Sequence, residues 1–352
     1  MIGGKNAPAN NFLPIMTPIT QIITRYIKHS GPMPVSDVMR LALLHPQHGY
    51  YHRKPAIGKE NDFITAPEIS ALFGLCIAAW VYRAWQEIGE PSTVPLIELG
   101  PGRGTLMRDI MAALPAPARK AMQIMLVEAN PTLKEQQQKR LQSQAICWLP
   151  SWSALPEGQK IVIGNEFLDT LPINQIIKKD ERWYERAIDL NSKGGLYFCL
   201  GKPYLSVLPP NAAAMKEGAL CEIPKEALSL VQVLCEDIRK TEGAALLIDY
   251  GSTDFTRGDS LQAVQDHQKI SVLESLGEAD LSAHVPFAWL KALAQTQKLN
   301  VRLSRQGEWL QSFALNVPQK EALNWERLCQ KEQMGTLFKV LEIASFPIKK
   351  TL

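Results

Sequence analysis

The stretch Pro95-Leu96-Ile97-Glu98-Leu99-Gly100-Pro101-Gly102-Arg103-Gly104-Thr105 decides the fold of this chain. An apolar run, glycines at alternate positions and a helix start are typical of a β-strand that enters a helix through a tight turn. Glycine lets the main chain adopt positive φ and approach a ligand without interference from a Cβ. The stretch therefore predicts a strand, a turn and a helix, with a nucleotide-like ligand at the turn.

The spacing of these glycines separates two classes of nucleotide-binding protein. Dinucleotide folds carry G-x-G-x-x-G, whose last glycine packs the helix close to the strand and leaves its amino end open to pyrophosphate. This turn reads G-x-G-x-G, and Glu98 stands two residues before it. A carboxylate there would repel pyrophosphate, but it suits an amino group and a sulfonium, which S-adenosyl-L-methionine carries. We therefore favour this cofactor, and an oxidoreductase with a nicotinamide cofactor is the weakest alternative.

A second acidic residue is expected at the next strand. The apolar run 122–127 predicts a parallel strand, and Glu128 follows it. A carboxylate at that end can accept hydrogen bonds from both ribose hydroxyls, as in dinucleotide folds, where the acid lies about 20 residues after the glycine turn. We predict that the following residues bind the cofactor: Glu98, Gly100, Gly102, Gly104 and Glu128.

The composition is that of an ordinary globular protein. With 352 residues and 46% hydrophobic content, the chain can bury a large core in one domain with insertions or in two domains. The net charge is only +3 and no run of lysine and arginine with interleaved aromatic residues occurs, so we expect no nucleic-acid partner. The six cysteines are scattered, which indicates a reducing compartment.

The sequence also bears on targeting, membrane insertion and metal binding. The first residues show no pattern of a secretory signal or transit peptide, and the longest apolar stretch, around 73–82, is too short to span a bilayer. We expect a cytoplasmic protein without membrane insertion. His45 and His48 stand three residues apart, but no third ligand is near and Pro46 breaks helical geometry, so we expect no metal site.

Beyond the glycine turn, helices and strands alternate as in a doubly wound α/β sheet. We expect helices at 131–141 and 225–240, and a last strand at 336–344 that pairs antiparallel at the sheet's end. The remaining strands of the sheet are expected at 145–149, 160–164 and 244–248.

The rest of the chain predicts additions to this core. We divide it into a helical N-terminal region (1–90) and a core (91–352) with two insertions. Helices are expected at 16–44 and from Pro67 to about 88. The first insertion (about 173–240) begins with antiparallel strands and a hairpin turn at 191–195, and the second (252–285) is a polar loop.

Several motifs spread over almost the whole chain now resemble one family, the MidA-like methyltransferases. This is the family of the mitochondrial complex I assembly factor that dimethylates an arginine on a core subunit. The chain departs from the family only in small ways. Leu168 stands where family members often have Phe, and Ala71-Leu72 stand where they often have Gln-Met. The matching stretches are 49–51, 62–70, 98–106, 165–172, 247–251, 259–263 and 277–285.

The resemblance implies a class I methyltransferase fold, S-adenosyl-L-methionine as methyl donor, and as acceptor a protein arginine on a complex I core subunit. It also implies that Thr65, Pro67 and Glu68 belong to a segment that covers the donor.

The chemistry of methyl transfer places demands on the acceptor side. Transfer from a sulfonium is an in-line displacement, so holding the nucleophile against the methyl group supplies most of the catalysis. A guanidinium, with a pKa above about 12, is not deprotonated in advance. A carboxylate can instead bind two of its N–H groups in a fork. Because ligands collect at the carboxyl ends of strands, the candidates after strand 160–164 are Asn165 for the cofactor and Glu166 and Asp169 for catalysis.

Further candidates come from loops. Glu68, Glu278 and Asp280 could fold over the cleft, and His284 could accept the released proton or be structural. Trp152, after the third strand, could stack on adenine or belong to the core. Either carboxylate after the strand could also be only a helix cap or solvated.

Three functions stay open. The chain could methylate a protein arginine, methylate a small molecule, or act as an assembly chaperone that keeps the fold without turnover. The sequence gives neither the acceptor residue nor the oligomeric state.

Overall fold

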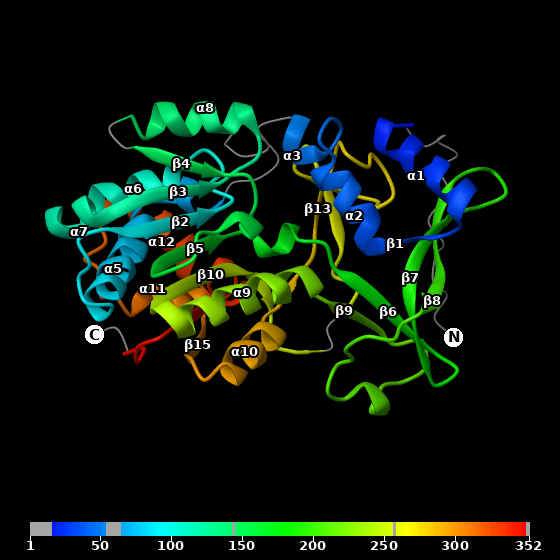
Figure 1. Ribbon diagram of the computed structural model, residues 1–352. Coiled ribbons are helices and arrows are strands. Elements are labelled where there is room, and N and C mark those ends of the chain that lie inside the picture. Colours follow the sequence, from blue (N-terminus) through cyan, green and yellow to red (C-terminus); the bar gives the residue numbers. More distant parts are fainter. Residues whose placement is uncertain (1–15, 54–64, 143–144, 256–257, 350–352) are drawn as a thin grey trace.

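The computed structural model describes residues 16–53, 65–142, 145–255 and 258–349 (Figure 1). The motif residues Asp62, Phe63 and Ile64 therefore lie outside the described residues. Figure 1 shows two lobes: a large sheet flanked by helices, and a smaller lobe that carries the N-terminal helices and a second, antiparallel sheet.

The large sheet confirms the predicted doubly wound α/β fold. Its strand order is β15-β16-β10-β5-β2-β3-β4. The strands from β10 to β4 run parallel, and β16 runs antiparallel to both of its neighbours. The strands are β2 (Val94–Leu99), β3 (Met122–Val127), β4 (Ile146–Leu149), β5 (Lys160–Asn165), β10 (Gly243–Ser252), β15 (Asn300–Arg305) and β16 (Phe338–Ala344), with β14 (Val285–Pro286) paired to β10.

One prediction about this sheet was wrong. The strand β16 is antiparallel as expected, but it does not lie at the end of the sheet, because β15 pairs with its outer edge. The sequence of β15 alternates polar and apolar residues and the strand is only half-buried, so it lacks the apolar run that marks the central strands.

Helices cover both faces of the large sheet. Neighbouring residues of β2 point to opposite faces: Leu96 packs with α5, α6 and α11, whereas Ile97 packs with α9 and α10. This alternation follows from the period of two in a strand. The helices are α5 (Ala71–Glu87), α6 (Thr105–Ala113), α7 (Ala116–Ala121), α8 (Pro131–Arg140), α9 (Lys225–Thr241), α10 (Phe287–Thr296), α11 (Gln306–Gln311), α12 (Ala322–Cys329) and α13 (Met334–Leu337), with short 3₁₀ turns η1 (Trp152–Ala154), η2 (Leu168–Thr170), η3 (Ala212–Ala214) and η4 (Gln319–Glu321).

The helix expected from Pro67 is broken in two. A four-residue helix, α4 (Ala66–Ile69), ends at Ser70, whose Oγ accepts a hydrogen bond from the Leu72 N–H at 3.2 Å and so caps α5. A serine at this position starts a new helix because its side chain satisfies one of the free N–H groups.

The smaller lobe is assembled from segments far apart in the sequence. Residues of the N-terminal helices, the first insertion and the loop 261–285 share one apolar core, in which Ile19 packs with Ile188 and Leu281. The division at residue 90 stays a prediction, and α5 packs with the large sheet. The elements are α1 (Pro18–Ser30), β1 (Met33–Pro34), α2 (Val35–Leu44), α3 (Tyr50–Arg53), β6 (Asn174–Lys179), β7 (Arg182–Leu190), β8 (Leu196–Pro203), β9 (Leu220–Ile223), β11 (Gln262–Gln265), β12 (Gln268–Ile270) and β13 (Asp280–Ser282).

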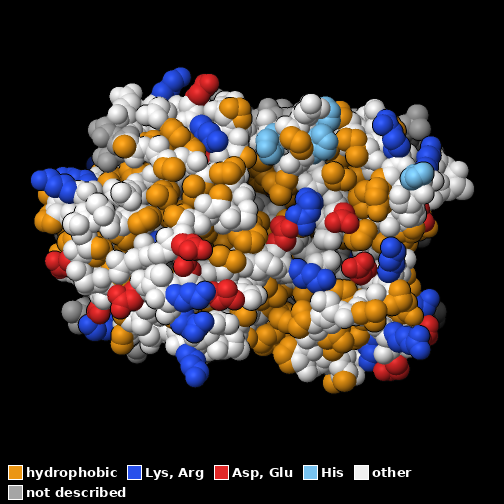
Figure 2. Space-filling view, in the orientation of Figure 1, with side chains coloured by type: hydrophobic (Ala, Val, Ile, Leu, Met, Phe, Trp, Pro, Cys, Tyr) orange, Lys and Arg blue, Asp and Glu red, His pale blue; other side chains and the backbone are white. Residues whose placement is uncertain are grey.

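The surface is mixed in character. Figure 2 shows basic and acidic side chains interspersed among hydrophobic ones over the face in view. Within the described residues, none of the helices has both the length and the apolar character that crossing a membrane requires.

Candidate active site

The glycine turn has the backbone that its sequence predicts. Gly100, Gly102 and Gly104 have φ of 60°, 50° and 78°. A Cβ on Gly100 would stand 2.8 Å from Cδ2 of Phe167, and one on Gly104 would stand 3.3 Å from Cγ of Gln137. Side chains at these positions would therefore be strained and would crowd the entrance to α6.

Glu98 is a buried acid beside this turn. It is 3% exposed, and the described residues provide no hydrogen-bond partner for its Oε2. Burial raises the pKa of this carboxyl to about 8, although the Met107 N–H in α6 lowers it. A buried carboxylate oxygen without a partner is costly unless a ligand satisfies it. The pair of features, an open main-chain turn and a buried acid, fits a ligand that carries an ammonium group.

Glu128 lies on the neighbouring strand and is linked to the turn through Gln137. Its Oε1 accepts a hydrogen bond from the Asn130 N–H at 2.8 Å. Gln137 is fully buried, and its Nε2 donates to the carbonyl of Gly102 at 2.7 Å and to Oε2 of Glu128 at 3.4 Å. Burial raises the pKa of Glu128, and these hydrogen bonds lower it. Sequence reasoning missed Gln137, because a glutamine in a polar helix carries no pattern of its own.

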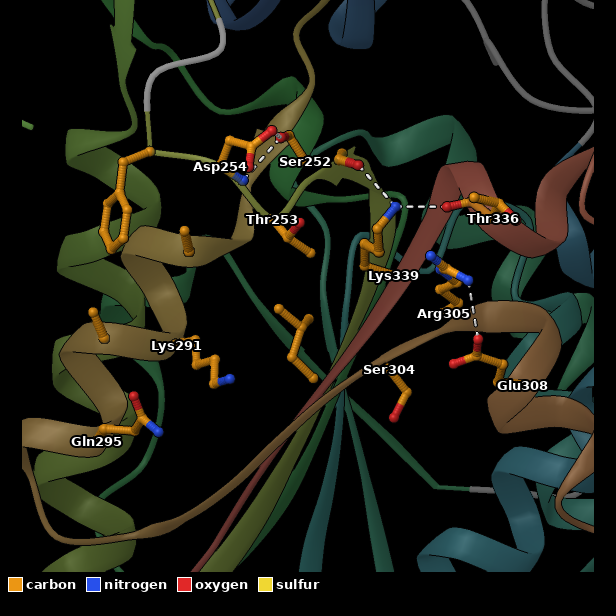
Figure 3. A pocket seen from close by; sticks show the side chains of 15 residues that line it. Ser252, Thr253, Asp254, Lys291, Gln295, Ser304, Arg305, Glu308, Thr336 and Lys339 are labelled. Carbon is orange, nitrogen blue, oxygen red and sulfur yellow. Dashed lines mark hydrogen bonds and ion pairs between the residues drawn. The ribbon is translucent and has the colours of Figure 1, made fainter. Parts of the chain in front are cut away.

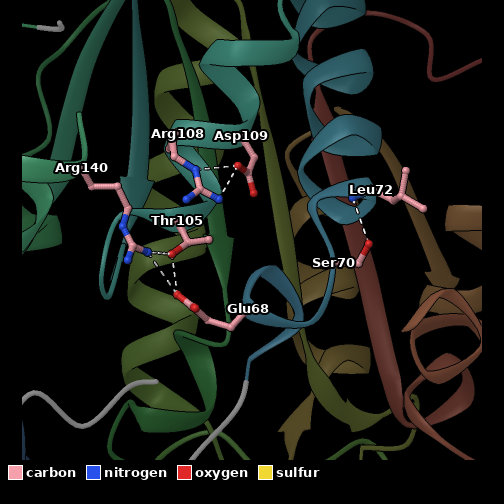
Figure 4. A network of polar contacts seen from close by, with 7 residues as sticks. All are labelled: Glu68, Ser70, Leu72, Thr105, Arg108, Asp109 and Arg140. Carbon is pink, nitrogen blue, oxygen red and sulfur yellow. Dashed lines mark hydrogen bonds and ion pairs between the residues drawn. The ribbon is translucent and has the colours of Figure 1, made fainter. Parts of the chain in front are cut away.

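Glu68 lies against the start of α6 (Figure 4). The Thr105 hydroxyl donates to Oε1 of Glu68, and Arg140 contacts both residues, with 3.4 Å between its Nη1 and Oε1 of Glu68. The interactions attach the segment before α5 to the helix that follows the glycine turn. They also engage Glu68 in an ion pair, so its carboxylate already has a cationic partner before any acceptor binds.

The other residues predicted for the cofactor lie around the same sheet edge. Asn165 ends β5 and is 8% exposed, and its Nδ2 donates to Oε1 of Glu166 at 3.2 Å. Thr65 precedes α4, and Pro67 is buried in it. Trp152 is half-buried in η1, where it packs against the core on the α9 side of the sheet. Their roles toward the cofactor stay predictions.

Glu166 occupies a strained position directly after β5. Its φ is 51°, and its N–H donates to the carbonyl of Ile248 at 2.9 Å. Its Oε1 accepts a hydrogen bond from the Ala66 N–H at 3.0 Å, which connects the acid to α4. Burial raises its pKa to about 7, and the charge of Asp169 contributes. A non-glycine residue with positive φ is often held at a functional site.

Asp169 is positioned by a second carboxylate that the sequence analysis did not select. Asp249, fully buried at the end of β10, accepts hydrogen bonds at Oδ2 from the N–H groups of Leu168 at 2.9 Å and Asp169 at 3.1 Å. Burial raises the pKa of both acids, and the charges of Asp169 and Glu166 raise that of Asp249 further. The signal was available, because Asp249 follows an apolar strand in the same way as Asn165 does.

The segment from β13 to His284 reaches the same place from the smaller lobe. Asp280 in β13 is 7% exposed and accepts a hydrogen bond from the Tyr51 hydroxyl at 2.8 Å. The Ala283 N–H donates to the carbonyl of Asp169 at 3.0 Å, which ties this loop to η2. His284 is half-buried, with its ring edge-on to Tyr250 at 5.4 Å between centroids. Glu278 is half-buried in the turn before β13.

A separate cavity lies elsewhere on this edge of the sheet. It measures about 850 Å³ and opens between α10, β15 and the start of β16 (Figure 3). Its cations are largely engaged: Nζ of Lys339 donates to three carbonyls, that of Gly251 among them at 3.0 Å, and Arg305 pairs with Glu308 at 3.3 Å. None of the predicted site residues lines this cavity. Nor do the described residues form a cluster of three or more side chains suited to a metal ion.

The comparisons with known proteins agree with this geometry. A family described as "Putative S-adenosyl-L-methionine-dependent methyltransferase" matches residues 76–304. The chain is 31% identical to "Protein arginine methyltransferase NDUFAF7 homolog, mitochondrial" of Drosophila melanogaster, over 91% of this chain and 83% of that protein. It is 30% identical to the human "Protein arginine methyltransferase NDUFAF7, mitochondrial", over 91% and 78%.

A solved structure resembles the whole molecule. It is described as a "likely methyl transferase from Burkholderia thailandensis bound to S-adenosyl-homocysteine", with a TM-score of 0.80, 25% identity and coverage of 93% of this chain and 91% of that one. The cofactor predicted from the glycine turn and Glu98 is thereby confirmed as S-adenosyl-L-methionine. The chain belongs to this family of S-adenosyl-L-methionine-dependent methyltransferases.

Proposed function

We propose that this methyltransferase acts in the cytoplasm on an arginine side chain of a protein, and that the protein is a subunit of a respiratory complex of the complex I type. The observation that carries the proposal is the group of carboxylates at the carboxyl ends of β5 and β10. Asp280 of β13 joins them through Tyr51, whose hydroxyl bonds to Asp280 and which also feels the charge of Asp169. Burial and mutual repulsion raise the pKa of Glu166 to about 7 and that of Asp249 well above its usual range. A delocalised cation with several N–H donors would relieve this repulsion.

The names of the relatives support arginine over other acceptors. Those of Drosophila and human are protein arginine methyltransferases that align over most of this chain. The mixed surface in Figure 2 gives no reason to prefer a nucleic acid.

The roles of the residues follow from the demands of the transfer. The bound cofactor supplies an electrophilic methyl group on its sulfonium. Glu166 and Asp169 would bind two guanidinium N–H groups in a fork, and the third nitrogen would then be directed at the methyl group. His284 would take the proton that the nitrogen loses. Glu98 and the glycine turn would hold the amino-acid part of the donor, and Glu128 its ribose.

The test has two steps. Calorimetric titration with S-adenosylhomocysteine measures donor binding, and mass spectrometry then locates methyl groups on a purified complex I type subunit incubated with the enzyme and S-adenosyl-L-methionine. We expect donor-dependent methylation of one or a few arginines. The variant Glu166→Gln should lower the rate at least about tenfold, whereas Glu332→Gln, at an exposed position, should not change it.

Two results would count against the proposal. Methyl groups found only on another residue type or only on small molecules would exclude an arginine of a protein as the acceptor. A subunit that binds tightly and gains no methyl group would instead favour the assembly chaperone.

A further inference from the structure

The motif Gly49-Tyr50-Tyr51 lies outside the residues assigned to catalysis or to the cofactor, yet its structure is specific. A Cβ on Gly49 would stand 2.5 Å from the His45 nitrogen and 2.7 Å from the Leu43 carbonyl oxygen, so only glycine permits this tight passage from α2 into α3. Tyr50 is 2% exposed, belongs to the core of the smaller lobe and contacts Tyr51 edge-on at 5.3 Å between ring centroids. The motif thus fixes the position of Tyr51.

Tyr51 touches both sides of the active site. Its carbonyl accepts a hydrogen bond from Nδ2 of Asn130 at 2.6 Å, and Asn130 follows the predicted ribose ligand Glu128 and caps α8. Its hydroxyl donates to Oδ1 of Asp280 at 2.8 Å. The donor side and the acceptor side are therefore connected through one residue.

The hydroxyl of Tyr51 remains a donor over the whole working range of pH. Burial, and then the charges of Asp280 and Asp169, raise its pKa well above the usual value of a phenol. A donor of this kind holds one oxygen of a carboxylate in place and so fixes the plane of the group. Recognition of a planar guanidinium depends on that plane, because the fork geometry requires both partners to be oriented.

We propose that Tyr51 is a positioning residue for the acceptor: it orients Asp280 so that this carboxylate binds the arginine guanidinium at a fixed place relative to the donor. The inference rests on the proposed function in one respect, since it takes the acceptor group to be a guanidinium. It adds Asp280 to Glu166 and Asp169 as a third carboxylate, supplied by the smaller lobe, that selects the acceptor.

The first test is a Tyr51→Phe variant, which keeps the ring and the main-chain bond to Asn130. The matched control is Tyr26→Phe, because Tyr26 is 43% exposed on α1 of the same lobe. In the protein saturated with S-adenosylhomocysteine, NMR titration compares a blocked arginine amide with a blocked citrulline amide, which has nearly the same shape and no charge. We expect wild type and Tyr26→Phe to prefer the arginine, and Tyr51→Phe to bind it roughly tenfold more weakly. Affinity for S-adenosylhomocysteine should stay within about threefold in all variants.

A double-mutant comparison separates positioning from a general loss of structure. Asp280→Asn alone should weaken the preference for arginine roughly tenfold, because Glu166 and Asp169 remain, and the further change Tyr51→Phe should then have less than about a twofold effect. If the losses of arginine affinity in the two single variants multiply in the double variant, the two residues act independently and the inference is overturned. A Tyr51→Phe variant that binds arginine as wild type does would also overturn it.

Methylation assays on the subunit keep the two proposals apart. If arginine is methylated and Tyr51→Phe leaves the acceptor KM unchanged, the inference fails and the proposed function stands. If another residue type is methylated, the proposed function fails. The titration with arginine and citrulline then decides the inference alone, and equal binding of the two amides by wild type would overturn it.

Discussion

The two halves of the active site are built in different ways. The donor half comes from one stretch of chain, in which the glycine turn, Glu98, Glu128 and Gln137 lie on two neighbouring strands and the helices after them. The acceptor half combines four distant segments, which supply Tyr51, Glu166 and Asp169, Asp249, and Asp280. Amide and N–H groups contact acids in both halves, but only in the second half do neighbouring carboxyl groups also raise the pKa values of Glu166 and Asp249.

This difference indicates what each half recognises. The donor is a fixed molecule, so a local motif with one unpartnered carboxylate oxygen, Oε2 of Glu98, is enough to bind it. The acceptor half gathers buried carboxyl groups whose ionisation is unfavourable until a cation arrives. It therefore depends on the packing of the smaller lobe onto the sheet more than the donor half does, which meets that lobe at the hydrogen bond from Asn130 to the carbonyl of Tyr51.

The largest effect is expected for Gly100→Ala. The substitution combines a φ of 60° with a Cβ only 2.8 Å from Phe167, so the turn must move. We expect S-adenosylhomocysteine to bind at least about 100-fold more weakly in calorimetry. The control Gly89→Ala has a φ of 90° but open space around the new Cβ, and should cost only about 1 kcal/mol of stability with unchanged binding. Equal losses of donor affinity in the two variants would show that a general loss of stability, rather than crowding of the turn, accounts for the effect.

The next largest effect should separate the halves. In Asp249→Asn, the amide cannot accept all the main-chain hydrogen bonds that the carboxylate receives from Leu168, Asp169 and Tyr250. The turn η2 should shift, and Asp169 with it. We expect turnover to fall about 30-fold while donor affinity stays within about threefold. Asp180→Asn, in the exposed turn between β6 and β7, serves as the control. A parallel loss of donor binding would mean that the halves are not separable at Asp249.

Glu98 should make donor binding depend on pH. Its pKa of about 8 in the donor-free protein lies above the ordinary value of 4.5, so the folded protein holds a proton that the unfolded chain has released. Stability without donor should therefore fall as pH rises from about 4.5 to 8. Glu166, with a pKa of about 7, adds to this loss.

An ammonium group pairs with the ionised form of Glu98, whose pKa is about 8, so donor affinity should rise about 15-fold between pH 6.5 and pH 8. Calorimetry in buffers of different ionisation enthalpy should detect release of a proton on binding. In Glu98→Gln the affinity should be lower and nearly independent of pH. The same pH dependence in the variant would assign the titration to another group.

The sequence predicted the donor half better than the acceptor half for a physical reason. The glycine spacing, Glu98 and Glu128 are constraints within one strand–turn–helix unit and the next strand, so they appear as a local pattern. The bond from Tyr51 to Asp280 joins residues that only tertiary packing brings together. The strand β15 was missed because a half-exposed edge strand needs no apolar run, and Gln137 because one buried amide has no periodicity.

Gln137 allows the smallest and most local test of the donor half. In Gln137→Leu the Gly102 carbonyl, Glu128 and the indole N–H of Trp148 each lose a partner, while the volume changes little. Lost hydrogen bonds of this kind cost about 1 kcal/mol each, and water can replace part of them, so we expect roughly fivefold weaker binding of S-adenosylhomocysteine. Gln138→Leu, on the exposed side of α8, should leave binding unchanged. If Gln137→Leu lowers turnover but not donor affinity, the amide supports the acceptor side instead, and the separation of the two halves does not hold at this helix.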